Sequence, residues 1–393
     1  MRPRFRRVAL AVLAGLLLAG LAAASAAAAE KRRGGGSVRM NEIQVIGTHN
    51  SYKRELTRTE ERTYDEIIAT PGDYEQFLAY SHPSIPNQFA RQEVRGLELD
   101  LFPDPAGGLY DEPLVRQRLG TGPLLDPAWQ APGIKVLHIA DLDYKTSCIR
   151  FVSCLEQVER WSDDDPGHVP LQIMLELKQS DRRAVAQGGV VAPPWDLGQL
   201  DALDAEIRSV FSERDLITPD DVRRPGLTLE QSVRRYGWPS LERSRGEVLF
   251  LLDNEPGPIR QAYTAGRPNL EGRVLFTNSR PGFADAAFVK RNEPRGMNTS
   301  EIQALVRDGY LVRTRSDVPL ATVSVNDPAM LQAALTSGAQ LISTDFPEIG
   351  MTGRYDSDYV AELPGDLPAR CNPVNAPRGC DSDRLEGLTW RDR

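Results

Sequence analysis

The sequence has little of what most zinc sites, nucleic-acid binders and membrane proteins require. Its 393 residues include only four cysteines and four histidines, and none of them shows the Cys-x-x-Cys or Cys/His spacing of a zinc site. Acidic residues outnumber basic ones by 55 to 47, and the resulting formal charge of −8 argues against nucleic-acid binding. No segment after residue 29 is long and apolar enough to span a bilayer. With 40% hydrophobic and 26% charged residues, the composition is that of a globular protein.

Residues 1–29 have the composition of a secretory signal peptide. Four arginines precede an uncharged run of alanine and leucine, which ends in the cleavage candidates Ala24-Ser25-Ala26 and Ala27-Ala28-Ala29. The alternative is an uncleaved membrane anchor, because residues 8–29 are long enough to cross a bilayer. We expect cleavage, and hence a secreted or extracytoplasmic protein with no transmembrane segment in the mature chain.

The cysteines suit an oxidising compartment. Cys148 and Cys154 are close in sequence, as are Cys371 and Cys380. Four cysteines allow three pairings, of which two local disulfides are the simplest. Buried free thiols are the alternative.

Short β-rich segments recur after residue 39, mostly with helical patterns between them. The expected strands are Ile43–Gly47, Gly96–Leu101, Lys135–Ile139, Leu171–Leu177, Val248–Leu252, Val274–Thr277, Tyr310–Arg313 and Gln340–Ser343. The expected helices are Thr59–Ile68, Ile149–Trp161, Leu197–Phe211, Ser300–Asp308 and Pro328–Ser337. Eight strands separated by helices predict a TIM-like (β/α)8 barrel rather than an open sheet.

No proline- or glycine-rich linker divides this region, so we expect a single catalytic domain. The expected organisation is a signal peptide (1–29), a flexible leader (30–38), the barrel (39–354) and an irregular, disulfide-tied C-terminal tail (355–393).

Polar residues cluster toward the carboxyl ends of the first four expected strands, where barrel enzymes place their chemistry. They are His49-Asn50, Glu98-Leu99-Asp100, His138 and Glu176-Leu177-Lys178. Alternation along a strand places Glu98 and Asp100 on one face, where they repel each other unless a cation lies between them. Three carboxylates and an amide oxygen suit calcium or magnesium better than zinc. Two histidines beside such a cation fit proton transfer during attack on a phosphodiester.

Each of these residues also has a structural alternative. Glu98 and Asp100 could form the solvated face of an edge strand, and either histidine could be an ordinary hydrogen-bonded residue. Glu176 could pair with Lys178 alone. A mixed histidine and carboxylate zinc site is a further alternative, although carboxylates dominate the set.

At these residues the sequence resembles the phosphatidylinositol-specific phospholipase C superfamily, especially its secreted, calcium-dependent bacterial branch. His49-Asn50-Ser51-Tyr52 is similar to the family's His-Asn-Ser/Thr-Tyr motif. Gln88 through Asp100 resembles its glutamine, helix and Glu-Leu-Asp strand. Val136-Leu137-His138 and Met174-Leu175-Glu176-Leu177 resemble the strands that carry the second histidine and the last metal-binding glutamate. The motifs cover roughly residues 40–180, and the C-terminal half matches mainly in its strand rhythm.

The resemblance implies a TIM-like barrel enzyme that cleaves phosphatidylinositol to diacylglycerol and a cyclic inositol phosphate. Its catalytic histidines would be His49 and His138. Its Ca2+ ligands, with Mg2+ less suited, would be Asn50, Glu98, Asp100 and Glu176. We further expect Asp345 to orient His49, and Lys178 and Arg315 to bind the substrate's phosphate or hydroxyl groups. The expected partner is a phospholipid head group at a membrane surface, met by a monomer.

Two other functions stay open at this stage. Leu175-Glu176-Leu177-Lys178 also resembles glycerophosphodiester phosphodiesterases, which share the barrel but typically have His-Arg where this chain has His49-Asn50. A non-catalytic barrel that binds lipid or sugar is the second alternative, although the full set of histidines and acids disfavours it.

Overall fold

The computed structural model describes residues 37–386. The expected signal peptide (1–29) and most of the expected leader (30–36) lie outside the described residues. No helix within residues 37–386 is long and apolar enough to cross a membrane. The described chain starts in contact with the barrel, since the backbone N–H of Leu241 donates to the Val38 carbonyl at 2.7 Å.

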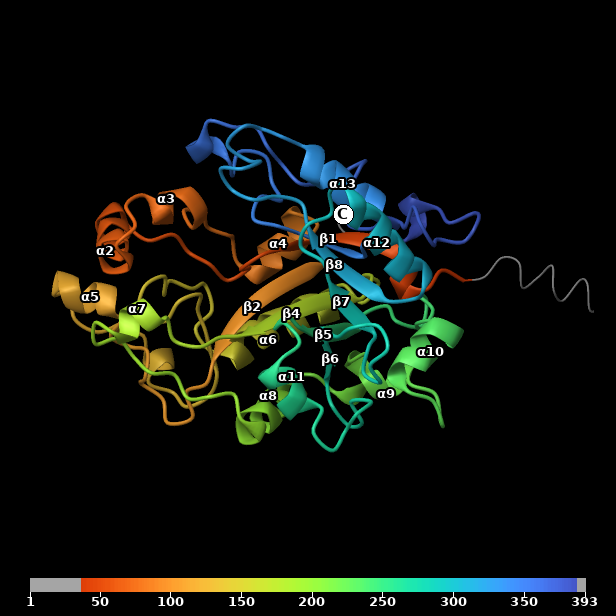
Figure 1. The fold of residues 1–393 in the computed structure, drawn as a ribbon, viewed down its shortest axis with the longest axis horizontal. Coiled ribbons are helices and arrows are strands. Elements are labelled where there is room, and N and C mark those ends of the chain that lie inside the picture. The colour runs from red at the N-terminus through yellow and green to blue at the C-terminus, as the bar shows by residue number, and fades with distance from the viewer. Residues whose placement is uncertain (1–36, 387–393) are drawn as a thin grey trace, which may run out of the picture.

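A barrel of eight parallel strands occupies the centre of the molecule (Figure 1). Their spatial order is β6-β5-β4-β2-β1-β9-β8-β7. Their bounds are β1 Ile43–Thr48, β2 Gly96–Phe102, β4 Leu171–Leu177, β5 Val248–Leu252, β6 Leu275–Thr277, β7 Phe288–Lys290, β8 Leu311–Arg315 and β9 Leu341–Thr344. A parallel bridge between Asn278 and Phe288 links the two end strands and nearly closes the barrel. The predicted TIM-like fold is confirmed.

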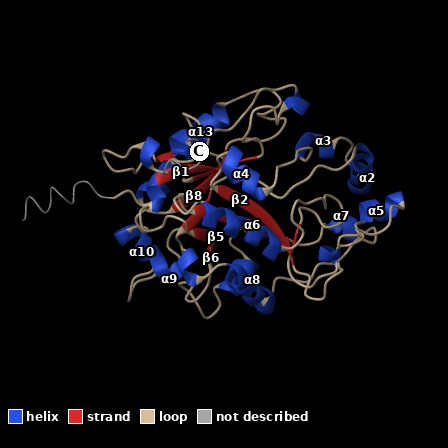
Figure 2. Cartoon of the chain, turned by 180° about the vertical axis from the view of Figure 1, so that it is seen from behind, coloured by secondary structure: helices blue, strands red, loops and turns tan. Residues whose placement is uncertain are grey.

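Helices surround the strands, as the view from behind shows (Figure 2). They are α4 Ile85–Arg91, α6 Phe151–Asp164, α8 Leu197–Val210, α9 Pro219–Val222, α10 Leu229–Tyr236, α11 Pro258–Tyr263, α12 Met297–Arg307 and α13 Ala329–Ser337. Four of the five expected helices correspond to α6, α8, α12 and α13, with ends shifted by a few residues. The fifth is α2 (Arg58–Ile68), whose N-cap Thr57 forms a capping box with Glu60.

One of the eight expected strands is wrong as a member of the barrel. β3 contains only Lys135–Val136 and pairs antiparallel with β2. The chain then leaves the sheet, because Leu137 packs into a different apolar cluster from Val136 and the backbone turns back between Ile139 and Asp143. The eighth parallel strand is instead β7, which is three residues long.

The long loops after β1, β2 and β4 form a lobe beside the barrel, at the left of Figure 1. The lobe carries α2, α3 (Asp73–Phe77), α5 (Leu114–Leu119) and α7 (Arg182–Val185). It has an apolar cluster separate from the main barrel core, which includes Tyr64, Tyr74, Leu114, Trp129, Leu137 and Tyr144. Because these loops all follow the carboxyl ends of strands, the lobe belongs to the end of the barrel where the polar residues gather.

Both expected local disulfides are present, Cys148–Cys154 and Cys371–Cys380. The second lies in the C-terminal tail, where β10 (Arg370–Cys371) pairs antiparallel with the start of β1. The tail is therefore fastened to the amino-terminal end of the barrel, opposite the polar residues.

Candidate active site

A close approach of three strands fixes the segment that precedes His49. A Cβ atom at Gly47 would lie 3.1 Å from the backbone of Gly96 on β2 and 2.7 Å from a side-chain carbon of Leu341 on β9. Glycine has no Cβ, so β1 fits between its two neighbours at this point.

The turn after β1 is bound directly to β2. Asn50 has a φ of +48°, a left-handed conformation that asparagine tolerates better than most residues. The backbone N–H of Ser51 donates to the Glu98 carbonyl at 2.9 Å, and the Glu98 N–H donates to Ser51 Oγ at 2.9 Å. These bonds bring His49 alongside Glu98.

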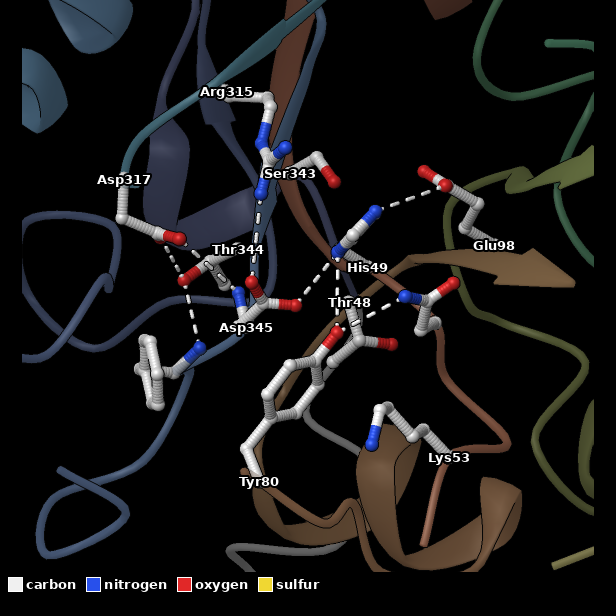
Figure 3. A network of polar contacts seen from close by, with 12 residues as sticks. Thr48, His49, Lys53, Tyr80, Glu98, Arg315, Asp317, Ser343, Thr344 and Asp345 are labelled. Atoms are coloured by element: carbon white, nitrogen blue, oxygen red, sulfur yellow. Dashed lines mark hydrogen bonds and ion pairs between the residues drawn. The ribbon is translucent and has the colours of Figure 1, made fainter. Parts of the chain in front are cut away.

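His49 lies between two carboxylates (Figure 3). Its Nδ1 is 2.7 Å from Asp345 Oδ1, and its Nε2 is 3.4 Å from Glu98 Oε1. Burial opposes the charged imidazole, but the charges of Asp345 and Glu98 outweigh it and raise the pKa of His49. Burial likewise opposes charge on Asp345, yet the charge of His49 and its hydrogen bond hold the pKa of Asp345 well below its usual range. The structure thus brings His49 and Asp345 into contact, and the role of Asp345 in orienting His49 stays a prediction.

Two residues that the sequence gave no reason to single out support this pair. The Tyr80 hydroxyl is 3.4 Å from His49 Nδ1 and accepts a hydrogen bond from Asn50 Nδ2 at 3.0 Å. The buried Asp317 accepts a hydrogen bond from the Asp345 N–H at 3.4 Å. Tyr80 comes from a loop with no regular pattern, so no periodicity could have placed it.

Three carboxylates converge beside His49. Asp100 on β2 is the direct cross-strand partner of Glu176 on β4, and Glu98 lies two residues earlier on the same face. One oxygen from each of the three lies within 4.8 Å of the others. Burial raises the pKa of Asp100 to about 8. The positive charge of Lys178 opposes this rise, and the negative charges of Glu176 and Glu98 add to it.

This arrangement fits a hard cation. Both Asp100 side-chain oxygens are buried; Oδ1 has no hydrogen-bond partner among the described residues, whereas Oδ2 contacts the Lys178 ammonium, and a buried oxygen without a partner suits a metal ligand. Among the described residues, neither histidine belongs to the three-carboxylate group, which disfavours the zinc alternative. The edge-strand alternative for Glu98 and Asp100 is wrong, because β2 lies inside the sheet and both side chains are buried.

Two of the chain's own cations contact these carboxylates. The Lys178 ammonium is 3.0 Å from Asp100 Oδ2 and 3.0 Å from Glu176 Oε2. Arg313 Nη2 is 2.8 Å from Glu98 Oε2 and also donates to Ser343 Oγ. Lys178 therefore contacts two of the three carboxylates and not Glu176 alone.

His138 reaches the site from the loop after β3. Its Nδ1 is 2.9 Å from Asp143 Oδ2. Burial lowers the pKa of His138. The hydrogen bond to Asp143 opposes this shift, and the positive charge of Lys178 adds to it. The His49 and His138 side chains are 20% and 15% exposed and that of Glu176 is 34% exposed, while that of Glu98 is 4% exposed, so both histidines and Glu176 reach solvent.

The other basic residues near the strand ends differ in their placement. Arg315 Nη2 lies 3.4 Å from Asp345 Oδ2, so it contacts the same carboxylate as His49 (Figure 3). Arg280 is exposed. The two remaining histidines are structural, since His82 Nε2 lies 2.9 Å from the His49 carbonyl and His168 is bound to Ser162 and its neighbour Val169.

Comparisons with known proteins agree with this geometry. Residues 38–373 match the family described as phosphoinositide phospholipase C, Ca2+-dependent. No curated protein matches the chain by sequence.

Solved structures resemble the chain in fold. A calcium-dependent phosphoinositol-specific phospholipase C from Pseudomonas sp. has 16% identity and a TM-score of 0.51, with 85% of this chain and 95% of that chain covered. Its myo-inositol complex gives 16% identity and a TM-score of 0.50, with 85% and 96% covered. A Ca2+-dependent phosphatidylinositol-specific phospholipase C from Streptomyces antibioticus has 16% identity and a TM-score of 0.48, with 82% and 98% covered.

The family match spans most of the chain, and it confirms the predicted enzyme class and the predicted calcium dependence. The chain therefore belongs to the Ca2+-dependent phosphoinositide phospholipase C family and is a calcium-dependent phosphodiesterase.

Proposed function

We propose that the enzyme cleaves phosphatidylinositol to diacylglycerol and a cyclic inositol phosphate. The observation that carries this proposal is a group of three carboxylates, two of them buried, flanked by two histidines that are each paired with an aspartate. Such a site can hold a cation and move two protons, which suits attack of the inositol 2-hydroxyl on the neighbouring phosphorus. Because the nucleophile belongs to the substrate, no serine or cysteine nucleophile is required.

Glu98, Asp100 and Glu176 would hold the calcium ion, with the side-chain oxygen of Asn50 as a fourth ligand. The Tyr52 hydroxyl donates to that oxygen at 3.3 Å, which orients the amide. A calcium ion held there would supply positive charge that stabilises the transition state and favours ionisation of the attacking hydroxyl.

The two histidines would divide the remaining work. Asp345 and Glu98 favour the protonated form of His49, so this residue can stabilise negative charge on the phosphoryl oxygens. A carboxylate of the proposed metal site, or a histidine, would take the proton from the 2-hydroxyl. His138 then donates a proton to the departing diacylglycerol oxygen, and water opens the cyclic product in a second step.

Lys178 and Arg315 are our candidates for binding the substrate's phosphate or hydroxyl groups. Both lie at strand ends, and their side chains are 18% and 22% exposed. Each already contacts a carboxylate of the site, so the contact with substrate would be made from a position that the site itself fixes.

The substrate would be met at a membrane surface outside the cytosol. Two disulfides are typical of proteins from an oxidising compartment, and residues 1–29 have the pattern of an export signal. Three apolar side chains after β7, β8 and β9 are exposed: Met297 at the start of α12, and Val325 and Ile349 in loops, are 85%, 66% and 77% exposed. These apolar side chains belong to the same end of the barrel as the histidines and suit contact with lipid.

Product analysis tests the proposed reaction. Purified enzyme is assayed on phosphatidylinositol and on glycerophosphodiesters, with calcium and with a chelator. We expect calcium-dependent release of diacylglycerol and a cyclic inositol phosphate, and loss of turnover in His138→Ala. Preferred cleavage of glycerophosphodiesters would show that the substrate is wrong, and wild-type turnover by His138→Ala would show that the acid is wrong.

A further inference from the structure

The imidazole of His138 is held by a carboxylate that has no access to solvent. The Asp143 side chain is fully buried, and its Oδ2 takes the hydrogen bond from His138 Nδ1. No other side chain among residues 37–386 forms a hydrogen bond with the His138 ring. Asp143 alone therefore determines which ring nitrogen stays available for chemistry, namely Nε2.

Asp143 is in turn held by a buried lysine. Lys53 is fully buried, and its ammonium lies 3.1 Å from Asp143 Oδ2 and 3.3 Å from Oδ1. The Tyr74 hydroxyl donates to Asp143 Oδ1 at 3.1 Å. Every oxygen of this carboxylate is thus occupied, and its position is fixed.

Lys53 joins the two loops that carry the catalytic histidines. Its backbone N–H donates to the Asn50 carbonyl at 2.8 Å, in the turn that follows His49. Its ammonium donates to the Leu78 carbonyl at 2.6 Å and lies 4.9 Å from the centre of the Tyr80 ring. Figure 3 shows Lys53 on the Tyr80 side of the site. The lysine therefore links the turn after β1 to the loop that holds His138.

A buried ion pair usually adds little to the free energy of unfolding. Removing a lysine and an aspartate from water costs several kcal/mol per ion, and well-packed apolar residues often stabilise such a position equally well. Apolar side chains, however, cannot accept a hydrogen bond from an imidazole N–H, and so they cannot favour one tautomer of the ring over the other.

On these grounds we infer that Asp143 and Lys53 are positioning residues for His138: Asp143 fixes the ring and its tautomer, and Lys53 fixes Asp143. The inference rests on the proposed role of His138 as general acid, but the orientation of the ring can be measured without turnover.

Nitrogen-15 NMR of the wild-type protein tests the orientation first. With only four histidines in the chain, His138 can be assigned by comparison with His138→Gln. At pH 8, where the imidazole is neutral, we expect the Nδ1–H tautomer. The Nε2–H tautomer would overturn the inference, and this test needs no variant of Asp143 or Lys53 that might unfold.

Kinetics of Asp143→Asn test the consequence. An asparagine amide can donate to Nδ1 and reverse the tautomer, so we expect kcat to fall about 100-fold or more, with KM changed less than about threefold. The matched control is Asp104→Asn, which removes the charge of another buried aspartate whose Oδ2 lies 2.9 Å from the buried Lys135 ammonium. An equal loss of kcat in both variants would reduce Asp143 to a structural residue.

A double-mutant cycle tests the part played by Lys53. If Lys53 acts through Asp143, Lys53→Met lowers kcat on its own but adds little to Asp143→Asn. If the fold-loss in kcat of the double variant equalled the product of the two single losses, Lys53 would not act through Asp143. A reversed tautomer in Asp143→Asn with normal kcat would leave the positioning intact and overturn the acid role proposed for His138.

Discussion

At the scale of single residues, the negative charges of the site are partly neutralised by basic side chains of the same chain. Three carboxylates face the cation position, while Lys178 contacts two of them and Arg313 contacts the third. Calcium must compete with the lysine for the oxygens of Asp100 and Glu176. We therefore predict that Lys178 lowers the affinity for calcium, in addition to the contact with substrate proposed above.

Replacing Lys178 tests this competition. In Lys178→Met the repulsion between the ammonium and the metal ion is gone, so we expect calcium to bind about tenfold more tightly or better. Isothermal titration of chelator-treated protein measures the change. Lys290→Met is the control, because Lys290 pairs with Asp253, outside the three-carboxylate group. An unchanged or weaker affinity in Lys178→Met would contradict the account.

His82 gives a prediction about pH and stability. Burial lowers the pKa of this histidine to about 4 from the usual 6.5. Between these values the unfolded chain binds a proton that the folded protein does not, so stability is complete above pH 6.5 and declines as the pH falls toward 4.

Urea unfolding at pH 7.5 and pH 5 measures this effect. Between these values the free energy of unfolding of wild type should fall by about 2 kcal/mol more than that of His82→Gln. Equal losses in both proteins would mean that His82 is protonated in the folded state.

At the scale of elements, the catalytic segments are short connections held in place from several sides. His138 follows a strand of two residues, whose Val136 N–H donates to the Ile149 carbonyl at 2.9 Å. Ile149 lies inside the loop closed by Cys148 and Cys154. This disulfide therefore supports the segment that presents His138, whereas Cys371–Cys380 lies at the opposite end of the barrel.

Removing each disulfide in turn separates stability from catalysis. The bridged cysteines are six and nine residues apart, so each double alanine variant should lose about 2–3 kcal/mol in the free energy of unfolding. We expect kcat to fall severalfold only in Cys148→Ala/Cys154→Ala. Equal kcat values in the two variants would show that the first disulfide does not support the catalytic loop.

The same elements show what the sequence could and could not predict. The Glu98, Asp100 and Glu176 cluster was predictable, because strand alternation and the barrel's parallel register place these side chains together. The position of His138 was predicted on the wrong element, because Lys135-Val136-Leu137-His138 alternates like a strand although only its first half pairs with β2. β7 was missed because three residues, Phe288–Lys290, are too few to show a period.

At the scale of the whole molecule, the residues of the site come from two parts, the regular barrel and the irregular lobe. The barrel supplies the three carboxylates and the arginines on its strands, and His49 directly after the end of β1. The lobe supplies Lys53, Tyr80 and Asp143, which depend on long-range packing of loops that carry no periodic signal. Sequence reasoning therefore found the carboxylate cluster and the partner of His49, Asp345, but not Asp143, Lys53 and Tyr80, which lie beside the two histidines.

The exposed apolar side chains at the carboxyl ends of the barrel strands are the part of the molecule that we expect to contact lipid. In a triple variant with glutamate at Met297, Val325 and Ile349, turnover on phosphatidylinositol vesicles should fall tenfold or more, because charged side chains resist entry into the bilayer surface. Turnover of a soluble short-chain substrate should stay within about twofold. Tyr236→Glu, at the end of α10, is the control. Equal losses on both substrates would indicate damage to the site instead.

The central claim is that oxygen ligands from separate strands meet around one cation. A crystal structure of the protein soaked in calcium, with the ion located by anomalous scattering, tests this most directly. We expect one ion coordinated by Asn50, Glu98, Asp100 and Glu176 at roughly 2.3–2.6 Å. An ion bound elsewhere, or these four side chains without an ion at saturating calcium, would contradict the account.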